Sequence, residues 1–337
     1  MKTYKAVEIT TPGQLNIVER PVREPGPGQV RLRVEAAGVC HTDVFAVEGV
    51  WPGLKYPLVP GHEIAGRIDA LGEGVTTWNV GQRVGVGWFG GECGECEPCR
   101  RGDFINCINL IIPGFTRDGG YAELVIVEAR SLASIPEELS AEEAAPLLCA
   151  GVTTYNALRN AKLRSGAVVA IQGIGGLGHL GVQFARRMGF YTVAIARGKE
   201  KEKLALELGA DKYIDSNSED PAEGLLKLGG ADGILATAAS GKSMGGLIAG
   251  LKARGKLIVV GVSNEPIEIS IPQLISGTKD IHGAASGTAM DIEDTLKFSC
   301  HQHIHSMNEV VPFEQAEEAY NKMKNNAARF RMVLTFK

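Results

Sequence analysis

The six residues Gly173-Ile174-Gly175-Gly176-Leu177-Gly178 narrow the possible folds of this 337-residue chain more than any other stretch does. They match the pattern G-x-G-x-x-G, follow an apolar run at 168–171 and open a helical pattern at 177–188. Glycines in this context permit a tight turn and the close approach of a pyrophosphate to a helix N-terminus. The alternative is a glycine-rich turn that only packs a helix on a strand. Further apolar runs at 191–195, 213–214, 233–235 and 256–260, with a helical pattern at 201–208, predict an α/β fold with a doubly wound parallel sheet.

The part of the chain before this region has a different texture. It is rich in turns and carries short β-type runs at 30–34 and 121–127, which predict a β-rich, barrel-like or sandwich domain. Ser140 and Glu143 form a capping-box pattern that opens a helix where the texture changes. A closing strand is expected at 332–336. We therefore expect two domains: residues 1–148, completed by about 291–337, and residues 149–290.

Charge and hydropathy exclude several classes of partner. The 35 lysines and arginines are outnumbered by 39 acidic residues, so a nucleic-acid partner is disfavoured. No apolar run approaches the roughly 18–20 residues of a membrane span. The first residues lack a long apolar signal core, and we expect a cytoplasmic protein.

Four of the seven cysteines lie close together in the sequence: Cys93, Cys96, Cys99 and Cys107. An odd number of cysteines without an export signal argues against a disulfide framework. The spacing C-x2-C-x2-C-x7-C can supply four thiolates to a closed tetrahedral zinc ion. An iron–sulfur cluster also uses four cysteines, but the dinucleotide-binding half favours zinc.

The end of the second nucleotide-domain strand bears on the choice of cofactor. An acidic residue there would bind the ribose hydroxyls of NAD. This chain has Ala196-Arg197-Gly198-Lys199 instead, and Arg197 and Lys199 can hold a 2′-phosphate. The sequence therefore favours NADP(H). NAD(H) remains the alternative, with both cations as solvated surface residues.

Three more residues suggest a second metal site: Cys40, His62 and Cys149. Each is weak evidence alone, but two cysteines and one histidine with an open fourth position make the zinc set of an alcohol dehydrogenase. Over essentially its whole length the chain resembles the zinc-dependent medium-chain alcohol dehydrogenases. The resemblance rests on the order of these motifs: Gly38-Val39-Cys40-His41-Thr42-Asp43, Pro60-Gly61-His62-Glu63, the four-cysteine lobe, Leu148-Cys149-Ala150-Gly151 and the glycine fingerprint.

The resemblance implies a GroES-like catalytic domain and a Rossmann cofactor domain. It also implies two zinc ions per chain, one structural and one catalytic, the latter acting as a Lewis acid while hydride passes between a small-molecule alcohol or aldehyde and the nicotinamide. Thr42 matches the proton-relay hydroxyl, and Asp43 matches a carboxylate that orients the histidine ligand. Glu63 matches a carboxylate that can exchange as a ligand. The plainer alternatives are a helix cap for Asp43 and a structural salt bridge for Glu63.

Other family positions are expected by the same resemblance. Phe45 stands where many members carry the histidine that ends the proton relay, so the relay must end elsewhere, with His41 as one candidate. The expected pocket wall consists of Trp51, Trp88 and Phe89. The expected additional cofactor contacts are His41, Val262 and Arg331, with Arg329 as a substitute for Arg331. Primary alcohols of medium size, including aromatic ones, suit such a wall, and a homodimer or homotetramer is expected.

Two other functions remain open. A polyol dehydrogenase shares the fold, but Cys149 and the intact cysteine lobe argue against it. The second is a non-catalytic, zinc-stabilised dinucleotide-binding protein. The complete set of three expected catalytic-zinc ligands, Cys40, His62 and Cys149, argues against this function. His301, His303 and His305 alternate, and a solvated strand or loop is expected there rather than a third metal site. Cys300 is expected to be a spare thiol.

Overall fold

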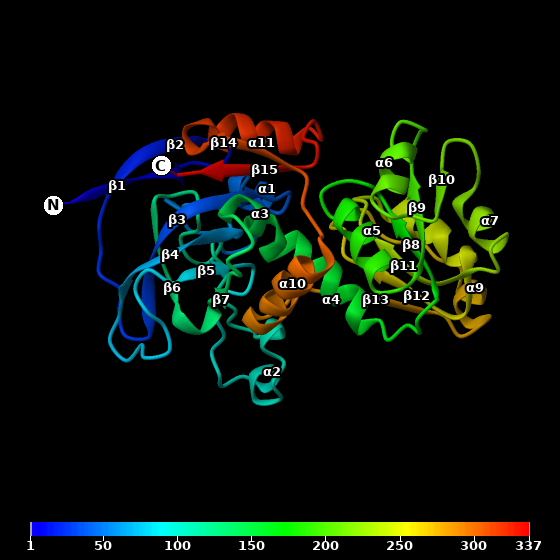
Figure 1. The fold of residues 1–337 in the computed structure, drawn as a ribbon, viewed down its shortest axis with the longest axis horizontal. Coiled ribbons are helices and arrows are strands. Elements are labelled where there is room, and N and C mark those ends of the chain that lie inside the picture. The colour runs from blue at the N-terminus through cyan, green and yellow to red at the C-terminus, as the bar shows by residue number, and fades with distance from the viewer. Residues whose placement is uncertain (1, 337) are drawn as a thin grey trace. The chain divides into compact units, whose positions relative to one another are not determined.

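The computed structural model describes residues 2–336, which divide into two compact units (Figure 1). The first unit is Met1–Val152 with Ser286–Lys337, and the second is Thr153–Ala285. The sequence placed these divisions at 148 and about 290. They differ because the turn Leu147–Gly151 and helix α10 (Ala289–Gln302) contact each other and belong to the first unit.

The first unit is built on a seven-stranded sheet in the order β14-β15-β3-β4-β5-β7, with β6 paired to β3. Every pairing in it is antiparallel except that of β14 with β15. Strands β1 and β2 form a separate antiparallel pair. The strands are β1 (Thr3–Ile9), β2 (Leu15–Pro21), β3 (Gln29–Val39), β4 (Ile64–Leu71), β5 (Arg83–Val86), β6 (Leu124–Glu128), β7 (Ala133–Ser134), β14 (Asn308–Pro312) and β15 (Arg331–Thr335). The helices are α1 (Asp43–Val47), α2 (Glu97–Arg100), α3 (Ala141–Pro146), α10 and α11 (Ala316–Lys324).

Strand ends position the residues of interest in this unit. Strand β3 ends at Val39, opposite Met332 of β15, and its Ala37 lies opposite Ile64, the first residue of β4. Because these pairs are antiparallel, the end of β3 and the starts of β4 and β15 meet at one edge of the sheet. The residues next to these ends are Cys40, Glu63 and Arg331.

Local signals in the first unit are mostly reproduced. The capping box is confirmed, since Ser140 Oγ accepts the Glu143 N–H at 3.2 Å and the Glu143 carboxylate accepts the Ser140 N–H at 2.9 Å. The run at 121–127 becomes a strand only from Leu124. Before that, the Tyr121 N–H donates to the Pro60 carbonyl, and residues 121–123 pair with residues 5–7 of β1 only through an isolated bridge.

The second unit is a six-stranded sheet in the order β10-β9-β8-β11-β12-β13, and all of its pairs are parallel. The predicted doubly wound sheet is therefore confirmed, with the strand order of a dinucleotide-binding fold. The strands are β8 (Val168–Gln172), β9 (Tyr191–Ala196), β10 (Lys212–Asp215), β11 (Ala231–Ala236), β12 (Leu251–Val259) and β13 (Asp280–Gly283). The helices are α4 (Val152–Asn160), α5 (Gly178–Arg187), α6 (Glu202–Glu207), α7 (Pro221–Leu226), α8 (Gly241–Gly246) and α9 (Ile271–Ile275).

The central strands of this sheet are buried on both faces, which explains their continuous apolar sequences. The chain order reverses between β8 and β11, and the glycine-rich turn follows β8 at that point. Within residues 2–336, no helix is long and apolar enough to cross a membrane.

Candidate functional site

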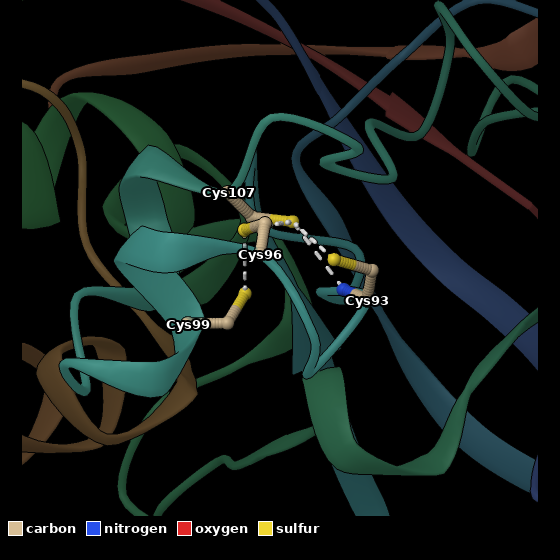
Figure 2. Close-up of side chains that lie close together, drawn as sticks. All are labelled: Cys93, Cys96, Cys99 and Cys107. Carbon is tan, nitrogen blue, oxygen red and sulfur yellow. Dashed lines mark hydrogen bonds between the residues drawn. The ribbon is translucent and has the colours of Figure 1, made fainter.

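The four cysteines of the lobe lie around one point in the first unit (Figure 2). Their Sγ atoms are all within 4.8 Å of one another, and the hydrogen-bonded pairs are 3.3, 3.6 and 3.9 Å apart. A Zn–S bond of about 2.3 Å in a tetrahedron places sulfurs about 3.8 Å apart. The distances between the sulfurs therefore fit a single metal ion whose coordination shell is completed by four thiolate ligands.

The backbone of the lobe favours thiolates at two of these positions. N–H groups of Glu95 and Cys96 lower the pKa of Cys93 to about 6, and the Cys99 N–H lowers the pKa of Cys96. Burial raises the pKa of Cys99 to about 12 when no metal is bound. Since a thiolate is the form that binds metal, backbone donors aimed at sulfur prepare the lobe for an ion.

A second cluster in the same unit brings together the ligand atoms of Cys40, His62, Glu63 and Cys149, all within 4.8 Å of one another. The sulfurs of Cys40 and Cys149 are 4.0 Å apart. His62 is fully buried, and its Nε2 has no hydrogen-bond partner among the described residues. Buried polar atoms are normally satisfied, so an unpartnered imidazole nitrogen beside two sulfurs fits a metal site with two thiolate ligands and one histidine ligand.

These side chains shift one another's pKa values. The thiol of Cys149 hydrogen-bonds to Cys40, which holds the pKa of Cys40 well below its usual range and raises that of Cys149. Burial acts to lower the pKa of His62, but the charges of Asp43 and Cys40 outweigh it and raise that pKa. Hydrogen bonding and nearby positive charge thus favour the thiolate of Cys40 more than in an isolated cysteine.

Cys149 lies in a π-helical turn, Leu147–Gly151, directly after α3. Pro146, the last residue of α3, has no N–H to donate to the Glu142 carbonyl, which accepts the Asn308 side-chain amide at 2.8 Å instead. Wide turns of this kind are frequent at functional sites because they re-aim single side chains. Here the turn carries the Cys149 sulfur to Cys40.

Asp43, the first residue of α1, contacts two residues of this cluster, His62 and Cys40. Its carboxylate is fully buried, and Oδ1 lies 3.0 Å from Nδ1 of His62, in a contact that is close but not aligned as a hydrogen bond. Oδ2 accepts the Cys40 N–H and the Tyr121 hydroxyl, both at 2.9 Å. The Asp43 carboxylate therefore contacts the side chain of His62 and the backbone N–H of Cys40.

Glu63 and Arg331 form a buried ion pair beside the same cluster. The Arg331 guanidinium donates to Glu63 Oε1, while Glu63 Oε2 has no partner among the described residues. Burial raises the pKa of Glu63 to about 8, against the opposing charge of Arg331. A Cβ at Gly38 would lie 1.8 Å from Glu63 Oε2, so only glycine leaves room for this carboxylate.

The structure gives Arg331 an internal partner that the sequence analysis did not predict. Arg331 is only 4% exposed. A buried guanidinium is costly without a charged partner, and the Glu63 carboxylate is that partner. The salt bridge weighed for Glu63 is thus present. A contact between Arg331 and cofactor phosphates stays a prediction.

Thr42 and its neighbours differ in exposure. The Thr42 hydroxyl lies 3.6 Å from the Cys40 sulfur, within reach of the ligand cluster. His41 is exposed, whereas Phe45 is partly buried and packs against the core of this unit. Phe45 offers no proton-transfer group at the place of the family histidine.

The aromatic residues near His62 form a compact group of Trp51, Trp88 and Phe115. Ring centroids lie 5.8 Å apart for Trp51 and Trp88 and 5.1 Å apart for Trp88 and Phe115. The His62 ring lies 5.3 Å from that of Trp88. Phe89, the third aromatic expected from the sequence, is buried at 3% exposure and is not one of the rings of this group.

The glycine-rich turn of the second unit has the backbone that a pyrophosphate site requires. Gly173 has φ +90°, and a Cβ at Gly178 would lie 1.6 Å from the Gly173 carbonyl oxygen. A Cβ at Gly175 would meet nothing within 4 Å, so the turn is open there. Gly176 and Leu177 are partly exposed just before α5. Glycine thus serves the turn at Gly173 and the close helix–strand packing at Gly178, which fits a dinucleotide.

The loop after β9 carries the two expected phosphate contacts, Arg197 and Lys199, both exposed. Between them Gly198, at φ +79°, is held by β10: its N–H donates to Asp215 at 2.7 Å, and its carbonyl accepts the Tyr213 hydroxyl at 2.6 Å. The Asp215 carboxylate also accepts the N–H of Asn217 and the hydroxyl of Ser218. This acid therefore anchors the loop and is occupied by internal donors.

Two family models match the chain: an alcohol dehydrogenase GroES-like domain at residues 26–137 and a zinc-binding dehydrogenase domain at residues 176–300. An alcohol dehydrogenase of Aspergillus sp., notN, is 42% identical over 336 residues, covering 99% of this chain and 98% of that protein. The chain belongs to the zinc-dependent medium-chain alcohol dehydrogenase family. It is accordingly an oxidoreductase of the alcohol dehydrogenase type.

Solved structures of this family agree with the fold. A cinnamyl alcohol dehydrogenase of Sorghum bicolor has a TM-score of 0.89 at 32% identity, covering 99% of this chain and 98% of that chain. An enzyme of Helicobacter pylori described as CAD, complexed with NADP(H), has a TM-score of 0.88 at 27% identity with the same coverage. The GroES-like and Rossmann parts predicted from the sequence are therefore confirmed.

Several residues of this dehydrogenase lie apart from both clusters. Val262 is exposed at 55%, and its cofactor contact stays a prediction. His301 lies in the last turn of α10 and His303 caps the helix at φ 53°, so the histidine trio lies at a helix end and not on a strand. Among the described residues, the only groups of metal-binding side chains of suitable spacing are the two clusters above.

Sequence reasoning missed three residues that the structure places at these sites: Phe115, Tyr121 and Lys201. The Nζ of Lys201 donates to the Ile174 carbonyl of the glycine-rich turn at 2.9 Å. Lys201 could have been predicted from the sequence, because it lies in the same cation-rich loop as Arg197 and Lys199. No sequence pattern pointed to Phe115 or Tyr121, since single aromatic residues in a β-rich domain are usually ordinary core residues.

Proposed function

We propose that this alcohol dehydrogenase interconverts primary alcohols of medium size, including aromatic ones, with their aldehydes, and that it uses NADP(H). The observation that carries the catalytic assignment is the cluster of Cys40, His62 and Cys149 with the unpartnered His62 Nε2. In this proposal these three residues hold a catalytic zinc ion, and Cys93, Cys96, Cys99 and Cys107 hold a structural one.

The chain's own residues then have distinct tasks. When bound, zinc supplies Lewis acidity toward the substrate oxygen, and the nicotinamide supplies the hydride chemistry. Thr42 Oγ1, next to Cys40, is placed to accept or return the alcohol proton. Because Phe45 cannot take the next step, the relay beyond Thr42 runs to water or to a cofactor hydroxyl. Glu63 Oε2, the unpartnered oxygen, is a reserve ligand.

Aromatic surface supports the proposed substrate class. Trp88 and Phe115 lie beside the His62 ring, Trp51 packs against both of them, and Trp51 and Trp88 remain partly exposed. Such rings offer apolar contact area to a medium-sized or aromatic substrate and few partners for several hydroxyl groups. A polyol is accordingly a poor candidate.

The proposed cofactor preference rests on Arg197 and Lys199, which flank Gly198; the Glu200 side chain lies against that glycine. A guanidinium binds a phosphate with charge-assisted, often bidentate hydrogen bonds of about 1.5–3 kcal/mol each. That corresponds to roughly tenfold to over a hundredfold in affinity. The NADP(H) complex of the Helicobacter pylori relative is consistent with this proposal.

A matched variant tests the cofactor proposal. Arg197→Ala should lower kcat/KM with NADP(H) by about tenfold or more and leave kcat/KM with NAD(H) nearly unchanged, and the preference should weaken at high salt. Arg187→Ala, at the end of α5, is the control for removal of an exposed cation in the same unit. A wild type that prefers NAD(H), or equal losses with both cofactors, contradicts the proposal.

One spectrophotometric screen tests the reaction itself. Primary, secondary and aromatic alcohols, polyols and the corresponding aldehydes are each offered with NADP(H) and with NAD(H). The proposal predicts the highest kcat/KM for a medium or aromatic primary alcohol or its aldehyde with NADP(H); a polyol as best substrate would contradict it. A homodimer or homotetramer, checked by sedimentation, and a cytoplasmic location remain predictions of the same kind.

A further inference from the structure

Tyr121 is a buried residue whose hydroxyl the mechanism above does not use. It lies in the segment between the cysteine lobe and β6, and its side chain is fully buried. The hydroxyl donates to Asp43 Oδ2 at 2.9 Å, and Asp43 is equally buried. A phenol hydroxyl at 0% exposure beside a carboxylate that contacts His62 is well placed to act on the metal cluster indirectly.

Backbone hydrogen bonds tie this tyrosine to the loop that carries His62. The N–H groups of Gly119, Gly120 and Tyr121 donate to the carbonyls of residues 59, 61 and 60, at 2.7, 2.9 and 3.0 Å. The segment that delivers Tyr121 and the loop that ends in His62 therefore form one hydrogen-bonded unit.

Side-chain packing holds the ring of Tyr121 under the same loop. Gly61 has φ +97°, and a Cβ there would lie 2.3 Å from Cδ1 of the Tyr121 ring. A Cβ at Gly119 would lie 2.1 Å from the Gly61 carbonyl oxygen. These close approaches leave the ring little freedom, so the direction of its hydroxyl toward Asp43 is set by the fold.

The two oxygens of the Asp43 carboxylate have different neighbours. Oδ2 accepts two donors, the Cys40 N–H and the Tyr121 hydroxyl, and Oδ1 lies 3.0 Å from His62 Nδ1. Two donors on one oxygen fix the rotation of the carboxylate and keep the other oxygen toward the imidazole. Without the hydroxyl, one donor remains and the carboxylate can turn.

We propose that Tyr121 is a positioning residue which, through Asp43, sets the orientation of His62 as a metal ligand. This inference rests on the proposed function, because it assumes a metal ion at Cys40, His62 and Cys149. Loss of a group that orients a ligand typically costs about 10–100-fold in metal affinity. Since Tyr121 acts one residue further away, we expect Tyr121→Phe to weaken this site by about tenfold.

Metal binding by the full chain, measured without turnover, tests the proposal. Co(II) is exchanged into the protein, and its absorption bands separate a site with two thiolates and one histidine from the four-thiolate lobe. Competition with a chelator then gives the affinity of each site. Tyr121→Phe should lose affinity and change its Co(II) bands at the Cys40 site alone, with the lobe as internal reference. Tyr56→Phe is the control, because Tyr56 donates to the Ala46 carbonyl at 2.7 Å and not to Asp43.

A double-mutant cycle shows whether Asp43 carries the effect. In an Asp43→Asn background, Tyr121→Phe should change the affinity of the Cys40 site by less than about twofold. The proposal is overturned if Tyr121→Phe leaves the site unchanged, if it weakens both metal sites together or prevents folding, or if its effect persists in Asp43→Asn. A wild type that binds no metal at the Cys40 site would refute the proposed function as well, which separates the two failures.

Discussion

The two ring nitrogens of His62 face different groups, and this difference defines its role at the scale of single residues. Nδ1 lies 3.0 Å from the Asp43 carboxylate, whereas Nε2 belongs to the ring that lies within 4.8 Å of the sulfurs of Cys40 and Cys149, and neither nitrogen makes an aligned hydrogen bond among residues 2–336. A carboxylate this close favours a proton on Nδ1, and the lone pair of Nε2 would then be the one available to a metal ion. The surroundings of His62 therefore suit the ligand role proposed for it, in addition to its place in the sequence motif.

Thr42 carries the first prediction at this scale. Its hydroxyl lies 3.6 Å from the Cys40 sulfur, and general acid–base help is typically worth about 10²–10⁴-fold. Thr42→Ala should lower kcat in that range with zinc content unchanged, whereas Thr42→Ser, which keeps the hydroxyl, should retain most of it. If steady-state assays give equal rates for all three proteins, Thr42 has no part in proton transfer.

Single residues differ in how far the sequence could predict them. Cysteines and histidines in a family order are chemically distinctive, so both ligand sets were predicted, and the structure brings each set together. The Glu63–Arg331 pair joins residues 268 positions apart through the pairing of β3 with β15, and no local pattern reports that. Phe89 was expected in the pocket wall from the family resemblance, but it is 3% exposed, and the ring beside Trp88 is that of Phe115.

At the scale of elements, helix α5 depends on glycine at its first position. An added Cβ at Gly178 would lie 1.6 Å from the Gly173 carbonyl, so Gly178→Ala must push the helix away from the turn. Overpacking typically costs about 1–3 kcal/mol. We expect a lower Tm and cofactor binding at least about tenfold weaker by calorimetry, with zinc content unchanged.

A helical glycine with open space provides the control for this variant. Gly246 of α8 has φ −59°, and a Cβ there would meet nothing within 4 Å. Gly246→Ala should therefore leave cofactor binding intact and keep or slightly raise Tm. Normal cofactor affinity in Gly178→Ala would mean that the turn does not hold the cofactor.

Helix α11 gives a prediction on pH dependence. Glu48, which follows α1, accepts hydrogen bonds from Lys324 Nζ at 2.6 Å and from the Tyr320 hydroxyl at 2.8 Å, and these bonds lower its pKa. A carboxyl whose pKa is lower in the folded state stabilises above its unfolded pKa of about 4.3, and this contribution is lost as pH falls through the folded value.

Glu48→Gln should thus lower the free energy of unfolding at neutral pH by about 1 kcal/mol or less, as for other partly exposed pairs. Denaturant unfolding across pH should show the difference from wild type shrinking below about pH 4. Glu318→Gln, an exposed carboxylate of α11, serves as control. A difference that stays constant over the whole pH range would contradict the assignment to Glu48 ionisation.

Elements of the second unit were easier to predict than those of the first. Strands such as β9 and β11 are buried on both faces and so read as continuous apolar runs. In the first unit, the bounds of β6 and the parallel pair β14–β15 depend on long-range pairing. The π-helical turn at Cys149 was likewise not predicted, because residues 147–151 resemble an ordinary helix in composition.

At the scale of the whole molecule, chemistry is divided between the units. Both metal-binding clusters lie in the first unit, and the glycine-rich turn and its cationic loop lie in the second. The two predicted boundaries differ from the observed ones by only a few residues. The change in sequence pattern marks roughly where a domain ends, but it does not report that α10 packs on the turn Leu147–Gly151. Metal binding and cofactor binding can therefore be perturbed separately.

Zinc content and turnover, measured on the same samples of wild type, Cys149→Ala and Cys96→Ala, test the central claim most directly. We predict about two zinc ions per chain in the wild type. Cys149→Ala should lose about one zinc ion and all measurable turnover while keeping its fold. Cys96→Ala should also lose about one, but its main defect should be a lower Tm, because a closed site contributes folding energy. Near-normal turnover in Cys149→Ala would contradict the assignment of Cys40, His62 and Cys149 as the catalytic zinc site.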